Sequence, residues 1–278
     1  MHKIIYATGL TGFIGSNLLH YLLEEYDKVV NFTRNKTLRI YAKDGAKEVG
    51  IASDFFLQNP SNTLINLATL YNPNPSSVAE LEHLIEANIH FPASVFNALS
   101  SLDNLKIINA LSYHQLLGFK SQNVYSLSKE IFKKFLDHQH SDIVNLYIFD
   151  TFGSGDKRNK VVDIFIKNII AGHPISIPSN EIRINLADVQ PLCRSLLMGI
   201  DLPSGSYSLK SPDTISLEDL AKMIMEISNK KVDILKVNTS SNYLDEVKTF
   251  PTNIFIEDSS YNLRDCMKKR IKEIKDDI

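Results

Sequence analysis

Short apolar runs alternate with apolar residues at helical spacing along the first 150 residues of the chain. In residues 13–25, for example, Ile14, Leu18 and Leu22 recur as they would on one face of a helix. Strands are predicted at 3–7, 28–32, 48–51, 63–67, 105–111 and 143–149, and helices at 13–25, 36–43, 78–99 and 124–137. We expect Pro92 to kink the long helix. This alternation predicts six βα units built on a parallel sheet.

The rhythm becomes more mixed after Asp150. Helices are predicted at 161–171, 188–200, 217–228 and 262–275, and short strands at 175–177, 181–186, 205–209 and 232–236. We therefore expect a doubly wound α/β domain over 1–150, to which 188–210 return. A smaller mixed α/β substrate region, residues 151–187 and 211–278, would cover the C-terminal edge of the sheet, where ligands bind in such folds.

Composition narrows the class of protein. The 278 residues are 44% hydrophobic and 22% charged, with 30 basic and 32 acidic side chains, which is typical of a globular protein without the basic excess of a nucleic-acid binder. The two cysteines are far apart, which argues against a disulfide framework and favours a reducing compartment. No signal peptide, apolar membrane span or metal-ligand spacing is recognised. We expect a cytoplasmic protein with no nucleic-acid, membrane or metal partner.

A glycine-rich turn joins the first predicted strand to the first helix. Gly9 permits a tight turn, Gly12 allows close approach of a pyrophosphate, and Gly15 lets the helix pack against the strand. Three glycines alone suit an ordinary turn equally well, but the helix N-terminus that follows favours phosphates. The pattern predicts a dinucleotide site, with expected contacts from Gly9, Thr11, Gly12, Phe13, Ile14 and Gly15.

The end of the second strand indicates which dinucleotide is bound. An NAD site usually carries an acidic residue here, whereas an NADP site lacks it and often supplies an arginine. Thr33 and Arg34 occupy this place and favour NADP, the alternative being a solvated arginine. Asp54, after the third strand, would accept a hydrogen bond from the adenine amino group or is an ordinary loop aspartate.

Three residues form a candidate catalytic group. Tyr125 and Lys129 lie one turn apart at the start of a predicted helix, and Ser112 ends the preceding strand. A free tyrosine has a pKa of about 10. A neighbouring cation would favour tyrosinate and bring that pKa toward neutrality. Tyrosine and lysine at this spacing are common by chance, but Ser112 and the glycine turn make acid–base catalysis the better interpretation.

With these motifs, residues 1–155 resemble the extended short-chain dehydrogenases/reductases. The matching residues are the turn 8–15, Asp54, Leu67, Ala68, Asn88, Ser112, Tyr125 and Lys129. The resemblance implies a Rossmann fold, an NADPH cofactor and a homodimer. It also implies that Tyr125 is the general acid, that Lys129 holds the nicotinamide ribose, and that Ser112 positions a ketone. Leu67 and Ala68 would line the cofactor channel, and Asn88 would have a structural or proton-relay role.

Within this superfamily the chain is similar to nucleotide-sugar 4-ketoreductases of the CDP-abequose and CDP-paratose synthase kind. The similar stretches are 108–115, 150–156, 204–209 and 215–217. This similarity implies NADPH-dependent reduction of a 4-keto-6-deoxy sugar linked to CDP or dTDP, for a bacterial surface polysaccharide such as an O-antigen. Candidate substrate residues are Tyr113, His114, Thr151 and Arg183.

Departures from related enzymes limit the alternatives. Sugar-nucleotide dehydratases carry an Asp-Glu pair directly after the serine, where this chain has Tyr113 and His114, so dehydration is disfavoured. A 4-epimerase with tightly bound NAD remains an alternative, although the acidic residue on the second strand is missing. A non-catalytic NADP-binding regulator would typically lose Tyr125 or Lys129.

Two further features concern how the substrate is held. Asp150 replaces an asparagine of the family, and Arg183, the nearest candidate for a diphosphate arginine, has an unusual spacing to Asp188. Residues 153–158 are expected to form a loop over the site, with a basic end that either meets a diphosphate or is solvated.

Overall fold

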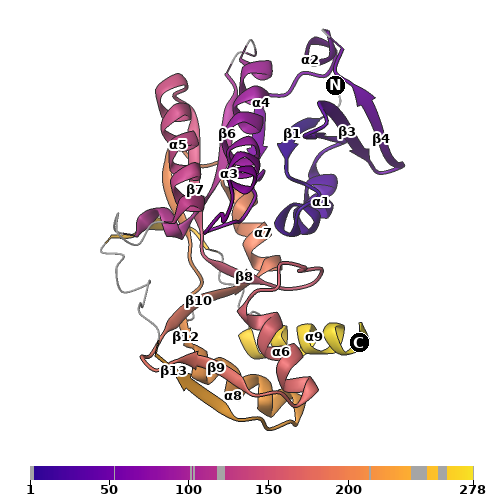
Figure 1. The fold of residues 1–278 in the computed structure, drawn as a ribbon. Helices are drawn as coiled ribbons and strands as arrows, with labels where there is room; N and C mark the ends of the chain where they lie inside the picture. The colour runs from indigo at the N-terminus through magenta and orange to yellow at the C-terminus, as the bar shows by residue number, and fades with distance from the viewer. Residues whose placement is uncertain are drawn as a thin grey trace.

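A sheet built mainly of parallel strands forms the larger part of the molecule, in the upper half of Figure 1. The computed structural model describes residues 3–52, 54–100, 102, 104–117, 123–212, 214–238, 249–255 and 262–277. Nine strands of this described part join the sheet in the order β14-β11-β7-β6-β5-β1-β2-β3-β4. Their bounds are β1 Ile4–Thr8, β2 Lys28–Phe32, β3 Thr37–Ala42, β4 Gly45–Gly50, β5 Thr63–Asn66, β6 Lys106–Ser112, β7 Ile143–Ile148, β11 Gly205–Leu209 and β14 Thr252–Asn253.

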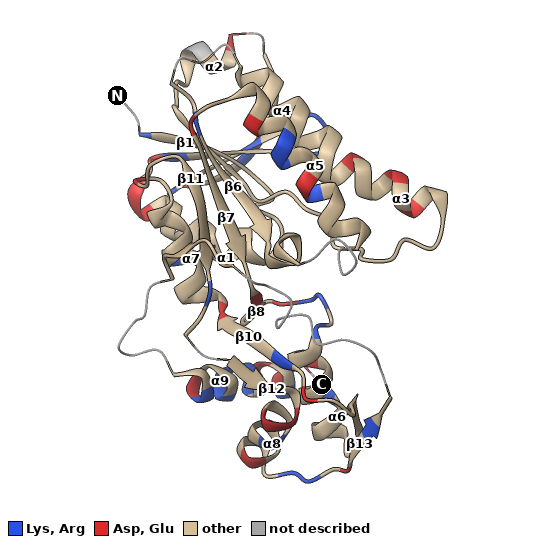
Figure 2. Ribbon diagram, turned by 90° about the vertical axis from the view of Figure 1, so that its left-hand side faces the viewer, with Lys and Arg blue, Asp and Glu red and all other residues tan. Residues whose placement is uncertain are grey.

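Helices cover both faces of this sheet. Helices α1 (Phe13–Glu25) and α7 (Val189–Met198) share a core with Ile5 of β1, whereas α4 (Phe91–Leu99) and α5 (Val124–Gln139) share one with Tyr6. Strands β1, β5 and β7 carry no charged residue, as expected for strands buried on both faces (Figure 2). The predicted doubly wound parallel sheet is therefore confirmed.

The helix predicted at 36–43 is wrong. These residues form β3, which pairs antiparallel to β2, and a tight turn at Asp44 leads into the antiparallel edge strand β4. Buried Leu38 and Ile40 alternate with exposed Arg39, which is the period of a strand. Gly45, with φ at 139°, adopts the backbone that this turn needs. A hairpin thus replaces one of the six predicted βα units.

The long predicted helix is interrupted just before Pro92. Helix α3 (Val78–Ile85) passes through a π-helical turn at Glu86–His90 into α4. Proline has no N–H to donate to the carbonyl of Asn88, four residues earlier, and the wider turn accommodates this missing bond. The same π-helical turn carries the buried Asn88 side chain. Elsewhere in this domain, a short helix, α2 (Phe55–Gln58), precedes β5.

The second region lies below the sheet in Figure 1 and has its own core. Strands β12, β10 and β8 form one small sheet and β13 and β9 another, with bounds β8 Asp150–Phe152, β9 Ile175–Pro178, β10 Arg183–Asp188, β12 Thr214–Ser216 and β13 Ile234–Val237. Helices α6 (Val161–Ala171), α8 (Leu217–Ser228) and α9 (Leu263–Asp276) pack together around Phe152, Ile166 and Met267. After β10 the chain returns to the large sheet through α7 and β11.

A chain of buried polar side chains crosses the interior of the large sheet. Thr8 Oγ1 donates to Asn66 Oδ1 at 2.7 Å, Asn66 Nδ2 to Asn109 Oδ1 at 3.0 Å, and Asn109 Nδ2 to Asn145 Oδ1 at 3.0 Å. Each pair lies directly opposite in the strand register. Because these buried groups satisfy one another's hydrogen-bonding capacity, this polar chain of side chains fixes the relative register of β1, β5, β6 and β7.

No helix in the described ranges combines the length and the apolar character needed to cross a bilayer.

Replacing Asn109 by alanine should lower the free energy of unfolding by about 1–3 kcal/mol, because it leaves the amide of Asn66 and the carbonyl of Asn145 without their buried partner. The matched control is Asn97→Ala on the exposed side of α4, which should change stability by no more than about 0.5 kcal/mol. Urea denaturation compares the two, and equal losses of stability would contradict the role of the polar chain.

Candidate active site

The glycine turn is pressed against the end of β5. Gly9 has φ at +74°, and a Cβ built on it would lie 2.7 Å from the carbonyl carbon of Leu67. A Cβ on Gly15 would lie 2.2 Å from the Gly9 carbonyl oxygen, so α1 packs directly onto the turn. Leu67 and Ala68 are thereby placed beside the turn, with the Ala68 amide donating to Thr8 Oγ1 at 3.0 Å.

The N-terminus of α1 fits a phosphate group. Its N-cap residue is Gly12, which is exposed and offers no side-chain cap to the first amides of the helix. Thr11 is exposed beside it, and Phe13 and Ile14 are half-buried in the first turn of the helix. The residues predicted to contact a dinucleotide therefore surround an open helix end.

The end of β2 lies at the same edge of the sheet as the glycine turn. Asn31 Oδ1 accepts a hydrogen bond of 3.1 Å from the Leu10 amide, which joins the two segments. The Thr33 hydroxyl is 2.7 Å from that of Thr37 in the turn toward β3. The adjacent Arg34 is exposed and makes no hydrogen bond or ion pair with a residue of the described ranges.

Asp54 comes directly before α2, and its carboxylate accepts a hydrogen bond from Gln58. Phe56 of the same short helix stacks on Phe32 of β2, with ring centroids 5.9 Å apart. The predicted adenine contact therefore belongs to a segment that packs beside the end of β2.

Ser112, Tyr125 and Lys129 are brought together at the carboxyl end of β6. Tyr125 is only 7% exposed, and hydrogen bonding with Ser112 and Thr69 acts to lower its pKa. Lys129, one turn further along α5, is 2% exposed, and its burial lowers its pKa to about 8. Asn123 starts the helix with a capping box, accepting from the Ser126 amide at 2.9 Å, which places Tyr125 in the first turn.

Asn88 fixes α5 against the segment that follows β5. Its Oδ1 accepts from the Leu70 amide at 2.7 Å, and its Nδ2 donates to Ser128 Oγ at 2.9 Å. Ser128 in turn donates to the Tyr125 carbonyl at 2.7 Å. These contacts support the structural role expected for Asn88.

Arg158 is a cation whose charge acts on Tyr125. Burial raises the pKa of Tyr125 above its ordinary value, while hydrogen bonds with Thr69 and Ser112 and the charge of Arg158 lower it. The same electrostatic role is predicted from the sequence for Lys129, and it stays a prediction. Arg158 lies 33 positions after Tyr125 in the sequence, so no local pattern indicates that its charge acts on this tyrosine.

The guanidinium of Arg158 is held on several sides. Asp156 accepts from its Nε at 2.8 Å and from its Nη2 at 2.7 Å, and the Thr151 carbonyl accepts from Nη2 at 2.8 Å. The group also lies over the Phe13 ring, 4.2 Å from its centroid. Arg158 therefore connects Thr151 on β8 with the start of α1.

Asp150 contributes a buried acid beside these residues. Its Oδ2 atom is buried and has no hydrogen-bond partner within the described ranges. Burial raises the pKa of Asp150 to about 6, against the opposing effects of Lys160, a hydrogen bond with Tyr113, and Arg158. An orphaned buried carboxyl oxygen is a site at which a hydrogen-bond donor of a ligand would be stabilised.

Tyr113 and His114, two of the four candidate substrate residues, form an aromatic stack with Phe149. The Tyr113 ring is 4.3 Å from that of His114 and 5.0 Å from that of Phe149. Burial, together with the charge of Lys160, lowers the pKa of His114 to about 4, so its imidazole is neutral at pH 7.

Tyr71 and Lys160 belong to the same cluster, although neither was predicted from the sequence. The Tyr71 ring lies 5.0 Å from that of Tyr125, and Lys160 Nζ lies 3.3 Å from the Tyr71 centroid. The available signals were an aromatic residue soon after a strand end and a lysine at the start of a helix, and neither is specific.

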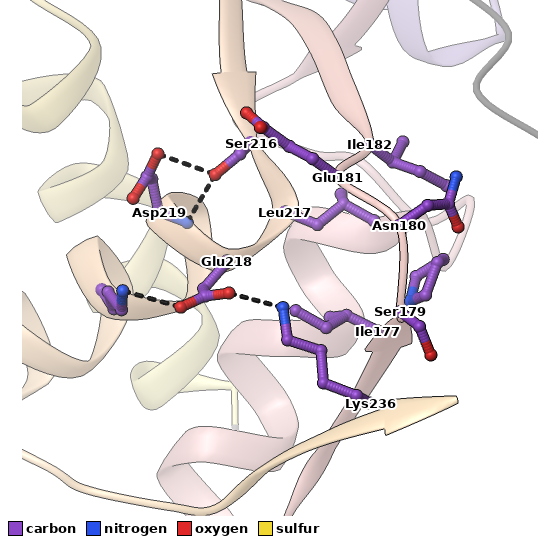
Figure 3. Close-up of a pocket in the computed structure, with 12 residues that line it drawn as sticks. Ile177, Ser179, Asn180, Glu181, Ile182, Ser216, Leu217, Glu218, Asp219 and Lys236 are labelled. Carbon is purple, nitrogen blue, oxygen red and sulfur yellow. Dashed lines mark hydrogen bonds and ion pairs between the residues drawn. The ribbon is translucent and has the colours of Figure 1, made fainter. Parts of the chain in front are cut away.

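Arg183 is placed apart from these contacts. Its guanidinium is exposed and donates to Glu181 at 3.0 Å and to the Thr214 carbonyl at 2.8 Å. A pocket nearby, lined by the β9–β10 turn and the start of α8, contains Glu218 bonded to Lys222 and Lys236 (Figure 3). None of its described lining residues was a predicted site residue.

No group of three or more His, Cys, Asp or Glu residues positioned to hold a metal ion occurs in the described ranges.

Comparisons with known proteins identify the family of this chain. The model of the NAD dependent epimerase/dehydratase family matches residues 5–189. CDP-abequose synthase of Yersinia pseudotuberculosis is 26% identical over 247 residues, covering 83% of this chain and 86% of that protein. CDP-abequose synthase of Salmonella muenchen is 24% identical over 181 residues, covering 61% and 60% respectively.

Solved structures share the fold over the whole chain. UDP-glucose 4-epimerase of Thermotoga maritima, solved with UDP-glucose, has a TM-score of 0.78 at 15% identity and 99% coverage of both chains. UDP-glucuronic acid 4-epimerase of Bacillus cereus, solved with UDP-glucuronic acid and NAD, has a TM-score of 0.76 at 16% identity, covering 99% of this chain and 100% of that one. At these identities the likeness establishes the fold.

The packing of the glycine turn predicts a strong asymmetry between two glycine substitutions. Gly15→Ala should lower the free energy of unfolding by more than about 2 kcal/mol, because the new methyl group meets backbone atoms that cannot move aside. Gly50→Ala at the edge of the sheet is the control, since a Cβ there has no atom within 4 Å. Denaturant unfolding measures both, and a Gly15→Ala protein as stable as the control would contradict the packing described.

Proposed function

Because the chain belongs to the NAD dependent epimerase/dehydratase family, we propose that it is an NADPH-dependent reductase of a nucleotide-linked 4-keto-6-deoxy sugar. The observation that carries this proposal is the buried Tyr125 phenol, whose pKa is lowered by Ser112, at the sheet edge that also holds the glycine turn. A phenol and a hydroxyl side by side suit a carbonyl oxygen that gains a proton during the reaction.

The cofactor is proposed to lie across the carboxyl ends of β1 and β5. The open N-terminus of α1 would take the pyrophosphate, and Leu67 and Ala68 would border the channel. Arg34, exposed and without an ionic partner in the described ranges, suits the 2′-phosphate of NADPH. Lys129 would hold the nicotinamide ribose, as in related enzymes. When bound, NADPH supplies a hydride to the ketone carbon.

The protein's own groups manage the proton. Ser112 would donate a hydrogen bond to the ketone oxygen, and Tyr125 would pass its phenolic proton to that oxygen as the alcohol forms. The tyrosinate left behind is stabilised by Thr69, Ser112 and the charge of Arg158, the three groups that lower the Tyr125 pKa. The low dielectric around this buried phenol strengthens each of these contributions.

The residues after Ser112 favour reduction over dehydration. Tyr113 is hydrogen-bonded to Asp150 and stacked on Phe149, and His114 is neutral. Neither supplies the carboxyl pair that dehydratases use at these positions, so another enzyme would have to produce the ketone.

The substrate proposed is a CDP- or dTDP-linked sugar whose product enters a bacterial surface polysaccharide such as an O-antigen. The similarity to two proteins named CDP-abequose synthase supports this choice. Tyr113, His114 and Thr151 would border the sugar. Arg183 stays a prediction for the diphosphate, because Glu181 and Thr214 hold its guanidinium in this structure.

We further propose that the enzyme acts in the cytoplasm as a homodimer. Apolar side chains are exposed along α5 and the neighbouring α3, namely Ile131 at 55%, Phe135 at 38% and Leu81 at 37%. A second copy of the same helices would cover them.

A nucleotide-sugar 4-epimerase is the second candidate. It is favoured by the family description and by the fold shared with UDP-sugar 4-epimerases. The two candidates differ in whether the cofactor is consumed, so one assay separates them.

The test supplies a CDP- or dTDP-linked 4-keto-6-deoxy sugar, generated in situ by a dehydratase, and follows NADPH absorbance while the product is identified by NMR. We expect one NADPH to be consumed for each 4-alcohol formed. Conversion of an unmodified nucleotide hexose to its C4 epimer, with no NADPH consumed, would instead establish the epimerase.

Tyr125→Phe should lower kcat about 10²–10⁴-fold, since it keeps the ring and removes the general acid, while NADPH still binds. Tyr207→Phe is the control, because that hydroxyl donates to the Pro203 carbonyl outside the cluster. Steady-state kinetics and NADPH fluorescence give the two quantities. Near-native turnover by Tyr125→Phe would remove the tyrosine from the mechanism.

The cofactor preference rests on Arg34. Arg34→Ala should raise the KM for NADPH much more than the KM for NADH, because only NADPH carries the 2′-phosphate. Arg39→Ala, which removes an exposed arginine from the neighbouring strand, should leave both values unchanged. Equal affinity of the unaltered protein for the two cofactors would be incompatible with the proposal.

A further inference from the structure

A buried ion pair joins the C-terminal helix α9 to α6. Arg270 Nε donates to Asp163 Oδ1 at 3.0 Å and Nη2 to Asp163 Oδ2 at 2.6 Å, and the two residues are 6% and 2% exposed. Glu273 accepts a further bond of 3.0 Å from Nη1. Buried pairs of this kind often add little net stability compared with apolar residues of similar size. Stability alone is therefore a weak explanation for this one.

Arg270 makes one more contact, and it leads toward the active site. Its Nη2 donates to the backbone carbonyl of Asp156 at 2.7 Å. Asp156 is 5% exposed, and its carboxylate binds both the backbone amide of Arg158, at 3.0 Å, and the guanidinium. A single residue, Asp156, thus links α9 to Arg158, whose charge acts on Tyr125.

The loop that carries Arg158 contains two glycines beside its internal hydrogen bonds. Gly153 and Gly155 both have positive φ, at 144° and 75°, and a Cβ on Gly155 would have no atom within 4 Å. Glycines at such positions allow many alternative backbone conformations. Contacts from outside the loop therefore help to hold Arg158 against Thr151 and over the Phe13 ring. Asn17 of α1 supplies one at the Ser154 carbonyl, at 3.1 Å, and Arg270 supplies another at the Asp156 carbonyl.

We propose that Arg270 is a positioning residue for catalysis, which anchors Asp156 and thereby keeps Arg158 against Thr151 and over the Phe13 ring, beside the glycine turn. The anchoring itself stands on the contacts above, and its effect on turnover rests on the proposed reductase function. Arg270 touches neither Tyr125 nor the glycine turn, so its influence passes entirely through Asp156 and Arg158.

The test replaces the buried pair by apolar residues, Arg270→Met together with Asp163→Leu. The pair is exchanged as a unit because Arg270→Met alone would leave the Asp163 carboxylate buried and uncompensated, which is strongly destabilising. The doubly substituted protein should fold with stability close to that of the unaltered chain, as measured by denaturant unfolding. If even this protein is unstable, Asp163→Asn is the smaller change, and it is expected to alter loop hydrogen exchange and kcat in the same directions as the double substitution.

Two measurements on the doubly substituted protein report separately on the anchoring of the loop and on turnover. Hydrogen exchange of the peptide that contains residues 153–158 should become faster, with no change in the glycine turn. With the ketosugar assay, kcat should fall about 3- to 10-fold, the range expected for coupled neighbours, while KM for NADPH changes by less than about 2-fold. Arg264→Met on the exposed side of α9, which breaks only the surface pair with Glu226, should alter neither quantity.

A double-mutant cycle identifies the route. Arg158→Gln should itself lower kcat, and once it is present the pair replacement should lower kcat by less than about 2-fold further. Fully multiplicative effects, or wild-type exchange and turnover in the pair replacement, would overturn the proposal. Faster loop exchange in a protein that reduces no ketosugar would instead show that the anchor is real and the proposed function is wrong.

Discussion

The Thr8 hydroxyl donates to Asn66 Oδ1 and accepts from the Ala68 amide, and the site is arranged around this pair of bonds. They join the carboxyl ends of β1 and β5, so the glycine turn meets Leu67 with no room for a Cβ on Gly9. The polar chain continues through Asn109 to Asn145, and the same register brings Ser112 to this edge. The carboxyl ends of parallel strands lie at one edge of a sheet. In this sheet, the hydrogen bonds between buried polar side chains fix the strands in the register that brings these ends together.

The second region supplies several charged residues to the site around Tyr125. Strand β8 and the loop after it bring Asp150, Arg158 and Lys160 toward a phenol that α5 and the large sheet hold in place. Asp156 and Asp150 offset part of this positive charge, so the groups remain compatible with burial. Chemistry at Tyr125 therefore depends on how the second region is held, which is why the anchor from α9 matters.

Local signals predicted much of the fold, and long-range contacts account for what was missed. The helices at 13–25, 161–171 and 217–228 were predicted with their observed bounds, because each has a clear apolar face. The strand at Thr37–Ala42 was mistaken for a helix, because a segment of six residues is too short to distinguish the spacing of apolar residues in a helix from that in a strand. Ser112 and Tyr125 were predicted as a group from their order in the sequence. The contacts of Tyr71, Lys160 and Arg158 join segments that come together only in the folded chain.

The most direct test of the central claim follows the hydride itself. A CDP- or dTDP-linked 4-keto-6-deoxy sugar is incubated with the protein and NADPH carrying deuterium at the transferable position of the nicotinamide. The product is then examined by NMR and mass spectrometry. We predict one deuterium at C4 for each NADPH oxidised, and none in the Tyr125→Phe protein over the same time. A product with no deuterium, formed while NADPH remains unchanged, would contradict the account.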